Sequence, residues 1–292
     1  MDTGKQYKKD DEFKRKARLH QSEYRADVLR VDYDEYGNML QMEDAKKGLN
    51  FYSDFNILEA VSDRYGKKYS KPLYANLLRS EHIPFNLFVP LRYNLDYARQ
   101  VLNEFVDNNI QEVKEIRIEY APPLADKYLK DKTSFDVYVS YLHQDGQDGA
   151  LGIEVKYTEK SYPLISGSKE EEDIDVIKKA SRYWEVSENS GLFHSGYEIL
   201  RRDKYRQIWR NHLLGESIQQ IDKISHFTSI TLFPKGNTHF SLVLPEYQAY
   251  LNDPKKVIGV TYEDFIGGLK KYSTGQRYDL WIKYLEDRYI ID

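Results

Sequence analysis

The stretch that decides the fold is residues 135–157, FDVYVSYLHQDGQDGALGIEVKY. It holds two apolar runs separated by the turn-forming segment 143–149, HQDGQDG. Apolar residues alternate with other residues along both runs, as they do in strands that bury one face. We therefore expect a β-hairpin with strands over residues 133–142 and 150–158.

Three charged side chains interrupt the apolar pattern of this hairpin. Asp136 lies on the first strand, and Glu154 and Lys156 lie on the second. A turn centred near residues 145–146 pairs positions whose numbers sum to about 290 to 292. Asp136 then faces Glu154 or Lys156, with Cβ atoms roughly 5 Å apart. Two carboxylates at that separation suit a divalent cation, whereas a register slip of one residue would put them on opposite faces.

The composition limits the class of protein. The chain has 292 residues, of which 40% are hydrophobic and 31% charged, as is typical of a globular protein. It lacks an apolar run of ~18 residues and an apolar leader, so we expect a cytoplasmic protein without a membrane span. The absence of cysteine excludes disulfides, zinc–thiolate sites and a cysteine nucleophile. The formal net charge of −4 gives no global attraction to polyanions, so any nucleic-acid binding requires local basic patches.

The rest of the chain alternates helical and strand patterns. A charged helix is expected over residues 10–30, and Pro84 is expected to interrupt the pattern that precedes it. Further helices are expected over 55–65, 71–83, 95–105, 198–221, 262–272 and 276–289, and another from the acidic stretch 169–175 toward Trp184. Strands are expected over 115–120, 227–233 and 257–260. This order predicts one α/β domain, residues 51–292, preceded by a helical and charged N-terminal extension, residues 1–50.

One helical segment carries a basic face. Arg202, Arg206 and Arg210 recur at intervals of four residues, which places them on one side of a helix. Such a face can bind a polyanion, and it can equally be an ordinary solvated surface.

The pattern Glu-x-Lys is weak by itself because the chain contains it three times, at residues 12–14, 112–114 and 154–156. The first lies in the charged helix, and the second lacks an acidic partner on a neighbouring strand. Only Glu154-Val155-Lys156 has an acidic partner on a neighbouring strand, Asp136. We therefore take this third pattern as the candidate site.

At these residues the chain resembles the PD-(D/E)XK nuclease superfamily, whose pattern is an Asp on one core strand and Glu-x-Lys on the next. Phe135 stands where the family name has proline. Segments 78–88, 210–214 and 232–234 are similar to an uncharacterised bacterial restriction-like branch of that superfamily. The resemblance implies a restriction-endonuclease-like α/β fold, with an α-β-β-β-α-β core and a mixed central sheet flanked by helices.

The resemblance also implies Mg²⁺-dependent phosphodiester hydrolysis by an endonuclease, most often of DNA, in a restriction or other anti-invader role. Asp136 and Glu154 would hold the Mg²⁺, with Mn²⁺ able to substitute and the Val155 carbonyl as a further ligand. Lys156 would orient the attacking water and neutralise developing charge. Glu81 is a further candidate ligand. Nucleases of this kind often form homodimers, and residues 1–50 could bind a partner protein or nucleic acid.

Two other functions fit part of the pattern. A nucleic-acid-binding or assembly module could keep the nuclease fold without turnover. A glycoside hydrolase also uses two carboxylates, but it places them on opposite sides of a sugar and gives Lys156 no role. A purely structural interpretation is that Asp136 and Glu154 face solvent and that Lys156 pairs with one of them across the strands.

Overall fold

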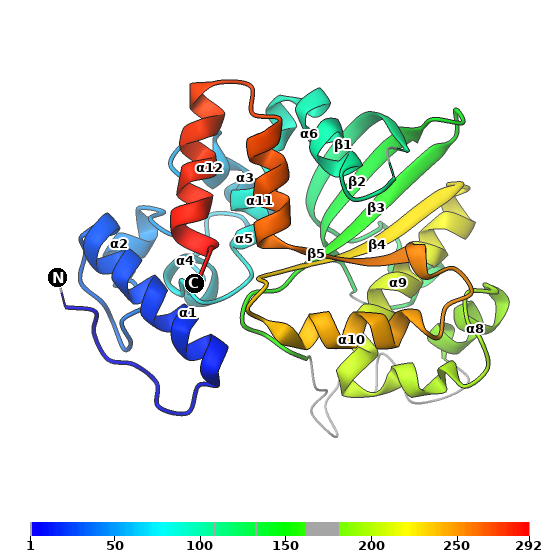
Figure 1. The fold of residues 1–292 in the computed structure, drawn as a ribbon, viewed down its shortest axis with the longest axis horizontal. Coiled ribbons are helices and arrows are strands. Elements are labelled where there is room, and N and C mark those ends of the chain that lie inside the picture. Colours follow the sequence, from blue (N-terminus) through cyan, green and yellow to red (C-terminus); the bar gives the residue numbers. More distant parts are fainter. Residues whose placement is uncertain (1, 108, 132, 162–180, 292) are drawn as a thin grey trace.

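A computed structural model describes residues 2–107, 109–131, 133–161 and 181–291. Its centre is a five-stranded sheet in the order β1-β2-β3-β4-β5 (Figure 1). The first three strands pair antiparallel, and β3, β4 and β5 pair in parallel. The strands are β1 (Ile110–Tyr120), β2 (Phe135–His143), β3 (Asp148–Val155), β4 (His226–Phe233) and β5 (Val257–Thr261). This mixed sheet and its flanking helices confirm the expected α/β fold.

Helices cover both faces of the sheet (Figure 1). One face packs against α8 (Arg182–Asn189), α9 (Asp203–Asp222) and α10 (Thr238–Gln248) through a core that includes Trp209 and Phe227. The other face packs against α5 (Ile83–Phe88), α6 (Leu95–Asn103) and α11 (Tyr262–Lys271) through a second core that includes Val101, Ile153 and Phe265. Both faces of β3 are therefore buried, as expected for a strand with a parallel neighbour.

The N-terminal segment packs against the C-terminal helix. Figure 1 shows α1 (Glu12–Glu23) beside α12 (Gln276–Tyr289). The buried Gln21 side chain donates hydrogen bonds to the Arg288 carbonyl at 2.6 Å and to the Tyr157 hydroxyl at 2.8 Å. The N-terminal segment thus contacts the chain just beyond β3. The remaining elements are η1 (Tyr24–Leu29), α2 (Met42–Lys46), α3 (Ile57–Tyr65), α4 (Lys71–Ala75), η2 (Pro90–Tyr93), η3 (Ala125–Lys127), η4 (Tyr197–Arg201) and η5 (Pro254–Lys256).

The hairpin register agrees with the prediction from the turn. The Cα pairs run from Val137 opposite Ile153 to Leu142 opposite Asp148, so the paired numbers sum to 290. Gly152 permits this close pairing, because a Cβ atom there would lie 2.4 Å from the ring of Phe135. The register is consequently fixed by the turn at one end and by tight packing at the other.

Two helices differ from the sequence expectation. The helix expected over residues 71–83 ends at Ala75, and Pro84 lies in the first turn of α5, a position that tolerates proline because the missing N–H has no helical acceptor. Helix α10 contains Pro245, and this proline conceals the helix in the sequence. The helix expected from residues 169–175 lies mostly outside the described residues. No helix in the described part of the chain is long and apolar enough to span a membrane.

Candidate active site

A cluster of charged side chains lies where β2 begins and β3 ends. Glu154 and Lys156 are each only 8% exposed, and Asp136 is half-buried. The Lys156 Nζ lies 2.6 Å from Oε1 of Glu154. The Oδ2 of Asp136 accepts a hydrogen bond from the backbone N–H of Val155 at 2.6 Å. The structure therefore brings the three residues selected from the sequence together.

The parallel pairing of β3 with β4 determines where this cluster lies. Glu154 is opposite Thr231, Val155 is opposite Leu232, and the N–H of Lys156 donates to the Leu232 carbonyl at 2.8 Å. The cluster is thus at the carboxyl ends of two parallel strands, the edge of an α/β sheet where ligands usually bind.

Helix α9 fixes the orientation of Glu154. Gln207 and Asn211 lie one helical turn apart, so their side chains project from the same face. The Gln207 amide donates to Oε1 of Glu154, and the Asn211 amide donates to Oε2 at 2.6 Å. Neither Asn211 nor Gln207 was selected from the sequence. The signal that could have identified them is the spacing of two amides on a helix beside the sheet.

Glu119 is a third carboxylate that sequence reasoning did not select. The β1–β2 register pairs Ile118 with Val137 and Tyr120 with Phe135, so Glu119 is beside Asp136. Burial raises the pKa of Glu119 to about 7; a hydrogen bond with Tyr65 opposes this rise, and the Glu154 charge adds to it. Acidic side chains from three neighbouring strands thus influence one another at this edge.

The site favours a cation. Burial, followed by the charges of Glu154 and Glu119, raises the pKa of Asp136 well above its usual range. Burial lowers the pKa of Lys156, but the carboxylates of Glu154 and Asp136 more than offset it, so the pKa rises overall. Ionisation of all three acids beside one ammonium would leave an excess of negative charge, which the raised pKa values of Asp136 and Glu119 oppose, and a divalent cation with oxygen ligands would compensate that charge. Carboxylates are the donors that a hard divalent metal prefers; among the described residues, however, the oxygens of Asp136, Glu154 and Glu119 do not form a group of three ligand atoms within 4.8 Å of one another.

Two further side chains border the cluster. Glu81 is in the turn before α5 and pairs with Arg79 at 2.6 Å; its charge contributes to the raised pKa of Glu119. Glu159 accepts hydrogen bonds from the backbone N–H groups of Tyr157 at 3.0 Å and Ser80 at 3.2 Å. Glu81 is consequently near the cluster, but it is engaged with a guanidinium.

The three arginines expected on one basic face have different surroundings. Arg202 is exposed. Arg206 is buried and pairs with Asp203 at 2.5 Å, and Arg210 is half-buried and donates to the Thr133 hydroxyl at 3.0 Å. Helix α9 packs against both the sheet and α8, so the side that carries Arg206 and Arg210 is largely covered. The structure does not place the three side chains together on an open surface.

A different group of basic residues lies beside the acidic cluster. A cavity of about 520 Å³ adjoins Glu119 and is lined by three arginines, Arg64, Arg92 and Arg117. Guanidinium groups bind phosphate oxygens well, and this cavity, which Asp63 and Glu119 also line, keeps a small excess of positive charge beside the acidic cluster.

Comparison with protein families identifies the family of the chain. The family model described as PD-(D/E)XK nuclease superfamily matches residues 8–291, nearly the whole chain. No curated protein and no solved structure matches the chain.

Proposed function

The chain belongs to the PD-(D/E)XK nuclease superfamily, and from this premise we propose that it is a Mg²⁺-dependent endonuclease that hydrolyses DNA. The observation that carries the proposal is the meeting of Asp136, Glu154 and Lys156 at the carboxyl end of β3, with the ammonium 2.6 Å from the Glu154 carboxylate. A purely structural ion pair explains neither the third acid, Glu119, nor the excess of negative charge.

The proposed metal ligands are Asp136 and Glu154, with the Val155 carbonyl and Glu119 completing the set and Glu81 as a further candidate. A bound Mg²⁺ or Mn²⁺ supplies a water of lowered pKa and stabilises negative charge on the phosphate.

The other residues of the site position the reacting groups. Lys156 holds its ammonium beside Glu154, from where it orients the attacking water and neutralises charge that develops on the phosphate oxygens. Gln207 and Asn211 bind both oxygens of Glu154 and keep the carboxylate in one orientation.

The substrate and setting follow from the charge distribution and the family. The cavity arginines Arg64, Arg92 and Arg117 would contact the phosphate backbone close to the acidic cluster, and the exposed Arg202 would extend this contact. The family resemblance supports the remaining parts of the proposal. These are DNA as the substrate, a restriction or anti-invader role, a cytoplasmic location and a homodimer in which each copy cuts one strand. Residues 1–50 would serve as a surface for a partner protein.

The test is nicking of supercoiled plasmid in Mg²⁺ by the wild type and by Glu154→Gln and Lys156→Met. We expect each substitution to lower the rate by at least about 100-fold, the effect of removing one electrostatic contact at a reacting centre. A matched control is the second Glu-x-Lys pattern of the chain, because Glu112 and Lys114 are both exposed. Glu112→Gln and Lys114→Met should cleave like the wild type.

Two outcomes would contradict the proposal. Equal Mg²⁺-dependent cleavage by the wild type and both site variants would remove the catalytic assignment. Intact plasmid that the wild type and all variants retard equally on a gel would favour the non-catalytic binding module.

A further inference from the structure

A second group of ligating side chains lies at the opposite end of the hairpin from the acidic cluster. His143 ends β2, Asp145 is in the turn between β2 and β3, and His226 begins β4. The Nδ1 of His143 is 2.9 Å from Oδ1 of Asp145, and the Nε2 of His226 is 2.8 Å from Oδ2. One ligand atom from each residue lies within 4.8 Å of the other two.

This group is separate from the candidate active site. His143 lies seven positions after Asp136 along β2, which corresponds to about 23 Å in an extended strand. One metal ion cannot contact both groups.

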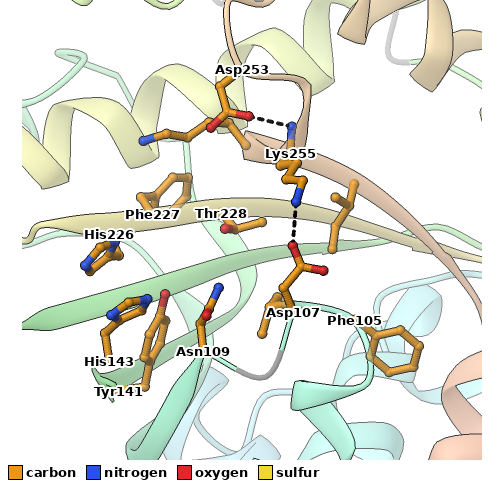
Figure 2. Close-up of a pocket in the computed structure, with 13 residues that line it drawn as sticks. Phe105, Asp107, Asn109, Tyr141, His143, His226, Phe227, Thr228, Asp253 and Lys255 are labelled. Atoms are coloured by element: carbon orange, nitrogen blue, oxygen red, sulfur yellow. Dashed lines mark hydrogen bonds and ion pairs between the residues drawn. The ribbon is translucent and has the colours of Figure 1, made fainter. Parts of the chain in front are cut away.

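The surrounding hydrogen bonds hold the three side chains in place. The imidazole rings of His143 and His226 stack with centroids 3.7 Å apart (Figure 2). The Asp145 carboxylate accepts the Gln147 N–H at 2.9 Å, and the Gly146 N–H donates to the His143 carbonyl at 2.9 Å. The turn and two strands therefore fix the ligands relative to one another before any ion binds.

The contacts of His143 favour a cation between the ring and the carboxylate. Its Nδ1 accepts a hydrogen bond from the backbone N–H of Asp145 at 3.2 Å, so the nitrogen presents a lone pair. The Oδ1 of Asp145, which also presents lone pairs, is 2.9 Å from that nitrogen. In this tautomer the Asp145 N–H already takes the one lone pair of Nδ1, so a metal ion that bridges Nδ1 and Oδ1 must displace that hydrogen bond.

We propose that His143, Asp145 and His226 bind a divalent transition-metal ion such as Zn²⁺. Two imidazoles and one carboxylate suit Zn²⁺, whereas Mg²⁺ prefers an all-oxygen set. A tetrahedral Zn²⁺ with bonds of about 2.0–2.1 Å places its ligand atoms about 3.3 Å apart, whereas one ligand atom from each residue lies within 4.8 Å of the others here, so the side chains must shift to close around the ion. The bound ion joins the β2–β3 turn to β4 and stabilises the sheet at this end.

The candidate site borders a cavity. Figure 2 shows His143 and His226 on one side of this cavity and Lys255 on another. The cavity holds about 300 Å³ and is also lined by Asn109, Tyr141 and Lys256. Water would complete the coordination, because Asp107 and Asp253 also line the cavity and Asp107 pairs with Lys255 at 2.9 Å.

The experiment titrates the full-length protein with Zn²⁺ by calorimetry and with Co²⁺ by visible absorption, both in excess Mg²⁺ to occupy the acidic cluster. We expect one equivalent to bind to the wild type, with cobalt bands of a tetrahedral site, and Zn²⁺ to raise the thermal midpoint. His226→Gln and Asp145→Asn should each weaken binding at least about tenfold. The exposed His194 provides the control, and His194→Gln should bind like the wild type.

The result does not depend on nuclease activity, because binding is read directly. The three side chains are all partly exposed, so the variants should fold, and circular dichroism checks this. Absence of saturable binding by the wild type would overturn the proposal. Equal binding by the wild type, His226→Gln and Asp145→Asn would overturn it as well.

Discussion

The replacement of Lys156 by methionine tests the electrostatic argument most sharply in the metal-free protein. The ammonium lies 2.6 Å from the Glu154 carboxylate, with both side chains about 11% exposed, and its charge also lowers the pKa of Asp136. Lys156→Met keeps much of the aliphatic volume and removes the cation. The carboxylates then remain buried together without a compensating charge.

The magnitude follows from the burial of this pair. Breaking a buried ion pair by removing one partner costs about 3–5 kcal/mol, because an unpaired charge stays out of water. The free energy of unfolding of a typical domain is about 5–15 kcal/mol, so this cost is a large part of it. The loss of stability also depends on pH. The pKa of Asp136 is already raised in the folded protein, and loss of the ammonium raises it further. The folded state then binds protons more tightly than the unfolded chain, so stability falls as pH rises above about 4, the unfolded value.

Urea unfolding followed by circular dichroism in EDTA, at pH 5 and pH 8, measures this loss. We expect the free energy of unfolding of Lys156→Met to fall well below that of the wild type at pH 8 and by less at pH 5. The control is Lys283→Met, because Lys283 pairs with Asp287 at 2.9 Å on the exposed side of α12 and should tolerate the change. A loss equal to that of the control, or independent of pH, would refute the account of the buried cluster.

Three further predictions concern single residues. Gly152→Ala should lower the free energy of unfolding by about 1–3 kcal/mol, because its Cβ would overlap a packed aromatic ring. Gly267→Ala is the control and should not lower it, because the space around Gly267 is open. Equal urea midpoints for the two variants would contradict this prediction. Asn211→Ala should reduce cleavage or metal affinity 10- to 100-fold, since it frees one oxygen of Glu154; wild-type kinetics in Mg²⁺ would argue against a positioning role. Mg²⁺ affinity measured by calorimetry should rise with pH through about 7 as Glu119 loses its proton. Glu119→Gln should flatten this pH dependence. An equally steep dependence in that variant would exclude Glu119 as a metal ligand.

The sequence predicted the hairpin because local rules determine it. The turn near residues 145–146 sets a register whose paired numbers sum to 290, and the alternation of Leu151, Ile153 and Val155 assigns the face that packs into one of the two cores. Extending that register by one residue puts Asp136 opposite Glu154. The local sequence pattern and the family resemblance were therefore enough to predict the family, the fold class and the proximity of the hairpin residues.

The parts that the sequence did not predict depend on tertiary packing. Glu119 comes beside Asp136 through a β1–β2 register that shifts twice, between Ile110 and Glu112 and between Val113 and Glu115, and no local signal marks such shifts. Periodicity also cannot say which side of a helix is covered. The side of α9 that carries Arg206 and Arg210 packs inside the protein, whereas Gln207 and Asn211 contact Glu154.

The most direct test of the central claim is the anomalous difference map of crystals soaked with Mn²⁺. We predict a peak within about 2.2 Å of carboxylate oxygens of both Asp136 and Glu154, between the usual distances for Mg²⁺ and Ca²⁺, with the Val155 carbonyl in the same shell. A fully occupied peak at His143, Asp145 and His226 with none at the acidic cluster would contradict the proposed catalytic metal site.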